Sequence, residues 1–128
     1  NRIPYLKQAN CDKEYSAKVQ CENILEWSSV GDRLDELVRN GPLVLSQKTP
    51  IRVAHRRGAD TIRERWLQLM EWQILNRGEL ALTLKSQHGT YIKEAISSDS
   101  GRTKNSISEF LKMSCECVEL DVLNVMLD

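Results

Sequence analysis

The chain has 128 residues, of which 41% are hydrophobic and 28% are charged, and its formal net charge is zero. This length predicts one domain, because a chain of this size buries enough surface to fold without disulfides or a structural metal. The composition excludes a disordered chain, and no apolar run reaches the roughly 18 residues of a membrane span. The polar start at Asn1 and Arg2 is not typical of a signal peptide, so we expect neither secretion nor membrane insertion.

The first half of the chain predicts a strand, a helix and two short extended segments. Residues 15–21 alternate between apolar and polar with a period of two, which is typical of a strand with one buried face. A helix is predicted over 32–39, with an aspartate as its cap and the glycine at position 41 as its end. Residues 43–45 and 51–53 predict short extended pieces on either side of the Thr49-Pro50 step.

The segment Ile62–Leu75 is compatible with a helix or with a strand. Its length and its Glu, Arg, Leu and Gln content suit a helix. As a strand it places four apolar side chains and one glutamine on one face, at Trp66, Gln68, Met70, Trp72 and Ile74. The sequence Asn76-Arg77-Gly78-Glu79 is typical of a hairpin turn, and leucines alternate after it at 80, 82 and 84. Because a hairpin explains both halves, we predict strand–turn–strand, with the two tryptophans and the methionine in its core.

The remaining segments complete an α+β domain. A helix is predicted over Thr90–Ser98, a loop at Gly101, a short helix near Ser106–Met113 and a closing strand near Val118–Met126. We therefore predict an antiparallel or mixed β-sheet with a few packed helices, formed by residues 1–128 as a single domain.

The four cysteines are at positions 11, 21, 115 and 117. Structural zinc sites usually use C-x-x-C pairs, and neither the first nor the second pair of cysteines has this spacing. The histidines, His55 and His88, also lack a cysteine or a carboxylate at ligand spacing. The sequence therefore predicts free, reduced thiols in an intracellular protein, and no metal site.

The segment Gln87–Glu94 is the most informative part of the sequence. A strand is predicted to end at Gly89, and Thr90 is available as the cap of the following helix. Lys93 then lies on the first helical turn, where a cation opposes the helix dipole and requires a compensating partner, for which a carboxylate is the natural choice. Spacing alone also allows Lys93 to be a simple exposed lysine.

Several segments resemble motifs of pseudouridine synthases and follow the same order. The sequence G-T-Y-I-K at 89–93, continued by D-S-G-R-T at 99–103, resembles the third motif of these enzymes. In this chain, K-E-Y at 13–15 resembles the second motif of the family, and Q-K-T-P-I-R-V-A-H-R-R at 47–57 resembles a further family segment. The sequence E-L-D-V at 119–122 resembles the last strand of the family. The resemblance is to the archaeal and eukaryotic tRNA pseudouridine synthase family, which modifies adjacent uridines in the tRNA T-loop.

This resemblance covers about residues 13–125 and implies an activity and a substrate pocket. The implied reaction isomerises uridine to pseudouridine in tRNA without a cofactor. A carboxylate attacks the nucleoside, and the base detaches from C1′, rotates and rejoins through C5. Tyr15 of the second motif would lie against the target uracil, and Lys93 would hold the catalytic aspartate ionised and aimed. The implied pocket also has an apolar floor at Ile92 and includes Gly89, Thr90 and Tyr91.

The basic residues are unevenly distributed along the chain. Between Gln47 and Arg65, six basic residues face two acidic ones, whereas from Asn105 to Asp128 five acidic residues face one lysine. A neutral protein with one basic segment can present a phosphate-binding face, although charge alone favours a solvated surface. The implied partner is tRNA, and the candidates for contact with its phosphates are Lys48, Arg52, His55, Arg56, Arg57 and Arg102.

Two parts that the family resemblance implies are missing from the 128 residues, namely the segment with the nucleophile and an N-terminal accessory RNA-binding part. Family members carry the nucleophilic aspartate in an upstream G-R-x-D-x-D-V-R segment, and nothing before Tyr15 matches it. Asp60 lies in the basic segment and Asp12 in another context, so we predict that neither replaces the nucleophile. We therefore expect the chain to be the C-terminal portion of a catalytic domain, to need the nucleophile-bearing N-terminal portion as a partner, and to be inactive alone.

Two other functions are compatible with the sequence. The chain could be a non-catalytic RNA-binding or scaffold remnant of the same fold, which the missing nucleophile favours and which Tyr15 and Lys93 disfavour. It could also be an α+β interaction module whose motif matches are coincidental. For the enzyme we expect an intracellular location, in the nucleus, the cytoplasm or mitochondria, and no membrane association.

Overall fold

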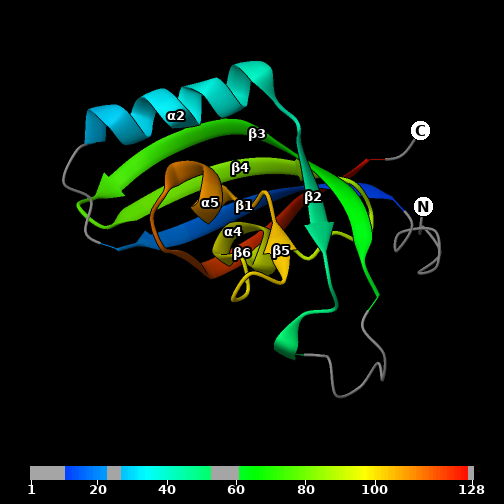
Figure 1. The fold of residues 1–128 in the computed structure, drawn as a ribbon. Helices are drawn as coiled ribbons and strands as arrows, with labels where there is room; N and C mark the ends of the chain where they lie inside the picture. Colours follow the sequence, from blue (N-terminus) through cyan, green and yellow to red (C-terminus); the bar gives the residue numbers. More distant parts are fainter. Residues whose placement is uncertain (1–10, 23–26, 53–60, 127–128) are drawn as a thin grey trace.

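Six antiparallel strands form one sheet in the order β5-β2-β3-β4-β1-β6, and helices pack against it (Figure 1). The computed structural model describes residues 11–22, 27–52 and 61–126. The strands are β1 (Asp12–Cys21), β2 (Leu43–Gln47), β3 (Arg63–Asn76), β4 (Glu79–Ser86), β5 (Thr103–Lys104) and β6 (Cys115–Met126). The helices are α2 (Trp27–Asn40), α4 (Ile92–Ser97) and α5 (Ile107–Leu111). The expected α+β class is confirmed, and the described strand pairs are antiparallel.

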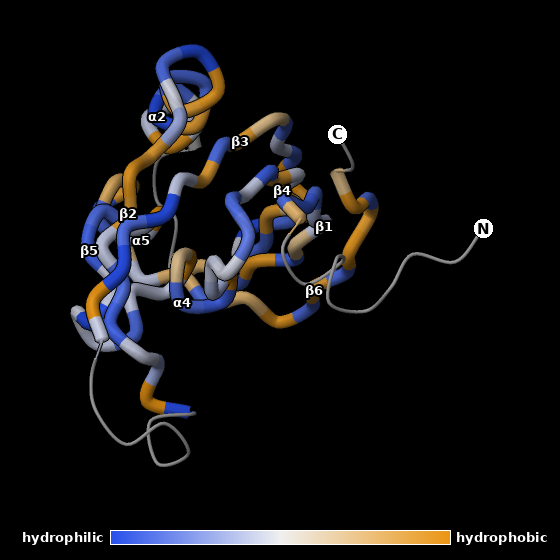
Figure 2. Tube along the Cα trace, turned by 90° about the vertical axis from the view of Figure 1, so that its right-hand side faces the viewer, coloured by the Kyte–Doolittle hydropathy of each residue, from blue (hydrophilic) through white to orange (hydrophobic). Residues whose placement is uncertain are grey.

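One hydrophobic core lies between the sheet and the helices. The alternating leucines of β4 are each at most 1% exposed, as their pattern predicts. Each described helix contributes to the same core, with Leu34 of α2, Ile96 of α4 and Ile107 of α5 at most 1% exposed. Figure 2 shows α4 and α5 together on one side of β1, β4 and β6. In the described part of the chain, no helix is long and apolar enough to cross a membrane.

The β3–β4 hairpin is confirmed, but β3 turns a different set of side chains into the core than predicted. The register between β3 and β4 shifts just after Leu69, which marks a bulge at Met70. Before the bulge, Leu67 and Leu69 enter the core, and after it Trp72 packs against the core. The prediction that Trp66 and Met70 belong to the core is therefore wrong, because a strict period of two does not describe a strand with one extra residue.

Helix α2 covers the part of the β3 edge that β2 leaves unpaired. Strand β2 pairs only with residues 63–67 of β3. Beyond this point the Gln68 amide donates hydrogen bonds to two carbonyl oxygens near the end of α2, at 3.2 Å to Leu37 and 3.4 Å to Val38. Helix α2 therefore protects this part of the β3 edge from pairing with another chain. Strand β2 leads on to the segment that contains the candidate basic residues.

Other boundaries also differ from the predictions. Helix α2 begins at Trp27, five residues before its predicted start, since its buried stripe already includes Val30. Strand β6 begins at Cys115, three residues early. Residues 51–52 are helical rather than extended, and position 53 lies outside the described residues. The two-residue β5 was not predicted because so short a strand has no measurable period, whereas the short helix before β6 is confirmed as α5.

Candidate functional site

The turn that connects β4 to α4 has a tight backbone that lies close to the Arg65 side chain. Strand β4 ends at Ser86, so the predicted strand end at Gly89 is wrong by three residues. Gly89 has a φ of +78°, and a Cβ atom at this position would lie 3.2 Å from Nε of Arg65. The Thr90 hydroxyl donates to the carbonyl oxygen of Gln87 at 2.7 Å and is therefore engaged within the turn.

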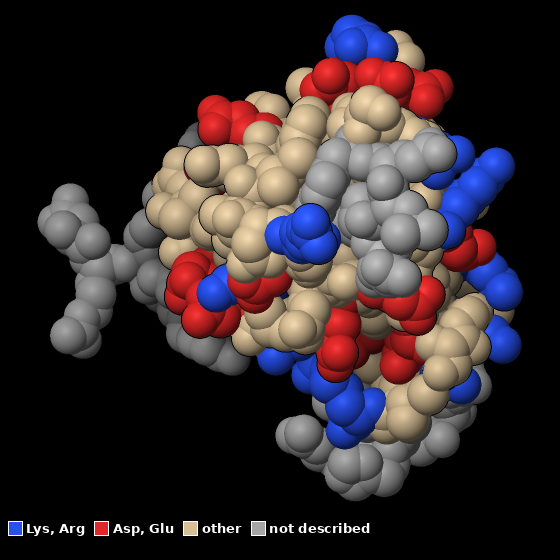
Figure 3. All heavy atoms as spheres, turned by 90° about the vertical axis from the view of Figure 1, so that its left-hand side faces the viewer, with Lys and Arg blue, Asp and Glu red and all other residues tan. Residues whose placement is uncertain are grey.

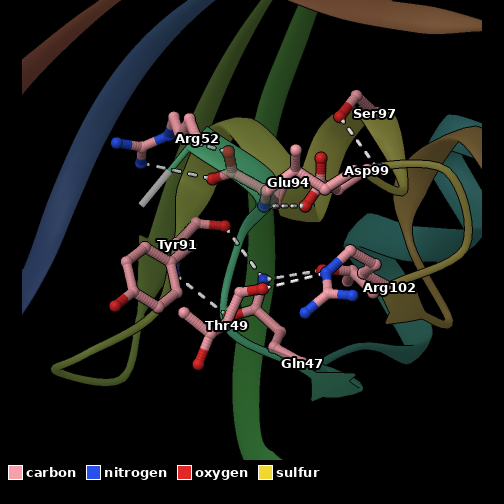
Figure 4. A network of polar contacts seen from close by, with 10 residues as sticks. Gln47, Thr49, Arg52, Tyr91, Glu94, Ser97, Asp99 and Arg102 are labelled. Atoms are coloured by element: carbon pink, nitrogen blue, oxygen red, sulfur yellow. Dashed lines mark hydrogen bonds and ion pairs between the residues drawn. The ribbon is translucent and has the colours of Figure 1, made fainter. Parts of the chain in front are cut away.

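Gln47 of β2 anchors the start of α4. The N-cap residue is Tyr91 rather than Thr90, which corrects the prediction, and its side chain makes no capping hydrogen bond. The Tyr91 N–H donates to Oε1 of Gln47 at 3.0 Å, and Nε2 of Gln47 donates back to the Tyr91 carbonyl at 3.0 Å (Figure 4). Nε2 also donates to Oγ1 of Thr103 at 3.2 Å, and Gln47 is only 3% exposed. One buried amide therefore joins the end of β2, the start of α4 and β5.

Arg52, five residues further along, makes a two-pronged ion pair with Glu94 of α4. Its Nε donates to Oε2 of Glu94 at 2.8 Å, and its Nη2 donates to Oε1 at 3.3 Å. The side chain of Glu94 is 7% exposed, whereas that of Arg52 is 53% exposed. The guanidinium also lies over the ring of Tyr91, 5.8 Å from its centroid. Hydrogen bonding to Glu94 raises the pKa of Arg52 above its ordinary value, so this side chain stays charged.

Further hydrogen bonds join the same two stretches of chain (Figure 4). The Ile51 N–H donates to Oδ2 of Asp99 at 3.0 Å. Nε of Arg102 donates to the Thr49 carbonyl at 2.9 Å, and the Lys48 N–H donates to the Arg102 carbonyl at 2.9 Å. The Q-K-T-P-I-R segment is thus docked onto the turn, helix and loop of the third motif. Two segments that the sequence separates form one structural unit, which we call the motif unit (residues 47–52 and 89–103).

Lys93 lies on the first turn of α4, as predicted, and its side chain is exposed. It borders a groove of about 400 Å³ that is also lined by α4, the Asp99–Ser100 turn and the start of β6. Cys117 of β6 lines the same groove, so Lys93 lies close to β6. Burial raises the pKa of the Cys117 thiol, and the positive charge of Lys93 opposes this shift. Within residues 11–22, 27–52 and 61–126, Lys93 forms no ion pair.

Tyr15 lies on β1 between β4 and β6, and its half-buried side chain packs against the core. Burial raises the pKa of its hydroxyl, and a hydrogen bond with the Ser86 side chain opposes this shift. Tyr15 shares one face of β1 with Val19, whose partner on β6 is Cys117, the thiol near Lys93. The Tyr15 side chain therefore points to the side of the sheet on which α4 and Lys93 lie. Tyr15 does not border the groove beside Lys93.

The other predicted site residues have different surroundings. Ile92, expected as a pocket floor, is 3% exposed and belongs to the core. Arg52 and Arg102, expected to contact RNA, are engaged within the motif unit. Lys48 is exposed and lines a shallow hollow with Arg63 and Tyr91. Outside the described residues lie His55, Arg56, Arg57 and Asp60.

Charge on the visible surface is mixed. On the face shown in Figure 3, lysines and arginines are interspersed with aspartates and glutamates, so this face has no field of one sign. Asp12, which we did not expect to be a nucleophile, accepts a hydrogen bond from the His88 N–H at 2.9 Å and ties β1 to the turn after β4. Lys48 and Arg63 form a local basic cluster, because both line the hollow beside Tyr91.

The cysteines are free thiols, in agreement with the prediction. The Sγ atoms of Cys21 and Cys115 lie 3.9 Å apart across β1 and β6 and are not bonded to each other. Over the ranges that the structure describes, no group of three or more His, Cys, Asp or Glu residues could hold a metal ion.

Sequence reasoning missed the polar residues that hold the motif unit together, namely Gln47, Glu94 and Asp99. A signal for Gln47 was present, because it continues the alternation of Leu43 and Leu45 and so faces the core. No comparable signal marks Glu94 or Asp99, whose partners lie 42 and 48 residues away in the sequence.

An α+β domain that carries a Q-K-T-P segment followed by a G-T-Y-I-K turn is the class of domain that the pseudouridine synthase resemblance leads us to expect. Comparison with solved structures agrees with the fold. The chain is similar to one chain in the crystal structure of a Cbf5-Nop10-Gar1 complex, with a TM-score of 0.60 and 16% identity, over 94% of this chain and 32% of that chain. At this identity the likeness concerns the fold alone.

The chain belongs to the Pus10 C-terminal family, because the family model described as "Pus10, C-terminal" matches residues 1–126. Relatives named tRNA pseudouridine synthase Pus10 include one from Mus musculus, 37% identical over 116 residues, which are 91% of this chain and 21% of the relative. One from Methanococcus voltae is 37% identical over 128 residues, 98% of this chain and 24% of the relative. One from Methanosphaera stadtmanae is 49% identical over 81 residues, 63% of this chain and 20% of the relative. The chain thus spans about a quarter or less of these relatives, and the expected family resemblance is confirmed.

Proposed function

We propose that this chain is the C-terminal portion of the catalytic domain of a tRNA pseudouridine synthase, which converts uridine to pseudouridine in the T-loop of tRNA. The observation that carries the proposal is the position of Lys93. The motif unit fixes the first turn of α4, and Lys93 projects from that turn beside a groove without an ion-pair partner among the described residues. A fixed and unpaired cation suits a carboxylate that another part of the protein supplies. The name shared by the relatives supports the same activity.

The positions of these residues lead to a proposed role for each of them. The N-terminal portion supplies the nucleophilic aspartate, and Lys93 keeps that carboxylate ionised and oriented. Tyr15 offers an aromatic ring to the extruded uracil from its half-buried position on β1. Ile92 acts from the core, where it fixes the start of α4. Gly89, Thr90 and Tyr91 form the turn that leads to Lys93, and the reaction needs no cofactor.

The partner in this proposal is tRNA, bound through its phosphates by basic side chains near the motif unit. Lys48, together with the basic run His55, Arg56 and Arg57, is assigned to this role, as is Arg102. The activity is assigned to the interior of the cell, in the nucleus, the cytoplasm or mitochondria, where tRNA is matured or used.

The direct test measures pseudouridine in the T-loop of unmodified tRNA after incubation with the complete protein, meaning this chain joined to its nucleophile-bearing portion. Tritium release from 5-tritiated uridine reports the reaction, and primer extension after carbodiimide treatment locates the product. We expect one or more T-loop uridines to be converted. Binding of tRNA without conversion of any uridine would refute the proposal and favour the non-catalytic remnant.

Replacement of Tyr15 separates its ring from its hydroxyl. Stacking of an aromatic ring on a base is worth about 1–3 kcal/mol, so Tyr15→Ala should lower the single-turnover rate at subsaturating tRNA by roughly 5- to 150-fold. Tyr15→Phe keeps the ring and serves as the matched control, with a rate close to that of the parent. A thermal melt of each variant shows whether the half-buried site still folds. Equal losses for both variants would assign the effect to the hydroxyl and its contact with Ser86.

Replacement of Lys48 and Arg63 tests the local basic cluster. These side chains line one hollow next to Tyr91, so the double variant Lys48→Ala/Arg63→Ala should weaken tRNA binding at low salt. The slope of log affinity against log salt should fall by about 0.7–0.9 for each phosphate that the protein no longer neutralises. Filter binding over a range of salt concentrations measures this slope. Arg77→Ala, an exposed arginine of the hairpin turn, is the control, and an unchanged slope in the double variant would assign the cluster to a solvated surface.

A further inference from the structure

Arg52 is expected from the sequence to bind RNA, but the structure gives it an internal partner. Its guanidinium makes both described hydrogen bonds to one carboxylate, that of Glu94, and lies over the Tyr91 ring. We propose that Arg52 and Glu94 are a positioning pair that fixes the first turn of α4 and thereby aims Lys93. This inference rests on the proposed function for the role of Lys93, whereas the effect of the pair on α4 is independent of that function.

Helix α4 needs such support because its own sequence stabilises it poorly. It has only six residues, and helices this short are unstable in water without tertiary contacts. Its N-cap side chain makes no capping hydrogen bond, and on its first turn the charge of Glu94, which the helix dipole favours, is opposed by that of Lys93. The start of the helix is therefore defined by contacts from outside, and these come from residues 47–52.

The buried carboxylate makes the arginine necessary. Glu94 is 7% exposed, and a carboxylate removed from water needs a charged and hydrogen-bonded partner. Arg52 is that partner, with bonds to both oxygens at 2.8 and 3.3 Å. Without Arg52, the Glu94 side chain would have to turn towards water. Because Glu94 is adjacent to Lys93 on the same turn, this movement would also displace the lysine.

The pair also explains why Arg52 is a poor phosphate contact. Its positive charge is balanced at short range by Glu94, so the pair as a whole attracts a phosphate weakly. One side of its guanidinium also faces the Tyr91 ring, 5.8 Å from the ring centroid, although the side chain as a whole is 53% exposed. Lys48 of the motif unit and the nearby Arg63 are exposed cations that form no ion pair within the described residues, so they suit a phosphate better.

The kinetic test compares Arg52→Ala, Arg52→Lys, Glu94→Gln and the double variant Arg52→Ala/Glu94→Gln in the complete protein. A displacement of about 1 Å in a positioned group can cost on the order of 100-fold in rate, so Arg52→Ala should slow the single-turnover rate at saturating tRNA by roughly 10- to 100-fold. Its tRNA affinity and salt slope should match those of the parent. The double variant should recover part of the missing rate, since it leaves no buried carboxylate unpaired. Arg52→Lys keeps the charge but not the two-pronged geometry, and its rate should lie between those of the parent and Arg52→Ala.

The structural test uses hydrogen exchange on the same proteins. In Arg52→Ala, the amides of Ala95 and Ser98, which close the turns of α4, should exchange faster, while the amides of β4 stay protected. Arg77→Ala, in the distant hairpin turn, should change neither set. If Arg52→Ala leaves α4 protection and the saturating rate unchanged but weakens tRNA binding with a smaller salt slope, Arg52 is an RNA contact and the inference is overturned. If the parent forms no pseudouridine, the proposed function fails, and the exchange of α4 still decides whether the pair fixes the helix.

Discussion

Replacement of Lys93 by alanine in the complete protein should slow pseudouridine formation by about 100- to 1,000-fold, the range found when one preorganised polar group is removed from an active site. The lysine is proposed to contact the nucleophilic carboxylate, and such a contact is strong in a site that excludes water. Affinity for tRNA should change by less than about threefold, because binding is dominated by many phosphate contacts. Single-turnover rates at saturating tRNA and filter binding measure the two effects separately.

Two control variants test whether the effect depends on the positive charge of the side chain and on its position at residue 93. Lys93→Arg keeps a cation on the first turn of α4 and should retain more activity than Lys93→Ala. Lys104→Ala removes an exposed lysine from β5 and should behave like the parent. Equal losses of rate and affinity in Lys93→Ala would show that the lysine binds RNA rather than the carboxylate. An active Lys93→Ala enzyme would remove Lys93 from the mechanism altogether.

The elements that carry Tyr15 and Lys93 could be predicted because their signals are local. The alternation of residues 15–21 defines the buried face of β1, and the leucines after the hairpin turn define β4 in the same way. The cap of α4 is displaced by one residue from the prediction, since Tyr91 and not Thr90 occupies the cap position. This shift leaves Lys93 on the first turn. Periodicity and turn residues act over a few positions, so they mark where these elements lie in the sequence, although contacts from residues 47–52 stabilise the start of α4.

The docking of β2 and the residues after it onto α4 could not be predicted, because it joins distant parts of the chain. Arg52 and Glu94 are 42 residues apart, and β5 pairs with β2 through Gln47 and Thr103. Charge counted along the sequence gives the number of arginines in a segment but not the acidic residues that the fold brings to them. The sequence therefore assigns Arg52 to RNA, while in the structure its nearest partner is a buried glutamate.

The incorrect prediction of the buried face of β3 has a different physical cause. The side chains of Trp66, Met70 and Trp72 share a face only if the strand is uninterrupted. The bulge at Met70 reverses the alternation, so Leu67 and Leu69 face the core on one side of it and Trp72 does so on the other. Neither glycine nor proline marks this bulge in the sequence. It becomes visible only in the pairing with β4.

The 128-residue chain alone should release no tritium from 5-tritiated uridine in tRNA, although the complete protein does so. The residues placed here supply a ring for the base at Tyr15, a cation for the carboxylate at Lys93 and a fixed helix start at Ile92. None of them is a nucleophile, and electrostatic preorganisation without a nucleophile does not open the covalent route. A rate equal to that of buffer is therefore expected for the chain alone, with the complete protein as the positive control.

Asp60 is the residue that could overturn this expectation. It lies outside the described residues, within a basic segment whose described end, at Arg52, is docked on α4 through Glu94. In the family pattern the nucleophile precedes the tyrosine of the second motif, whereas Asp60 follows Tyr15 by 45 positions (60 minus 15). Asp60→Ala in the complete protein should therefore leave the rate of pseudouridine formation unchanged within about twofold, a free-energy change in the barrier of less than about 0.5 kcal/mol. If the chain alone is active and Asp60→Ala abolishes that activity, Asp60 is the nucleophile, and Lys93 must then pair with a carboxylate from its own chain.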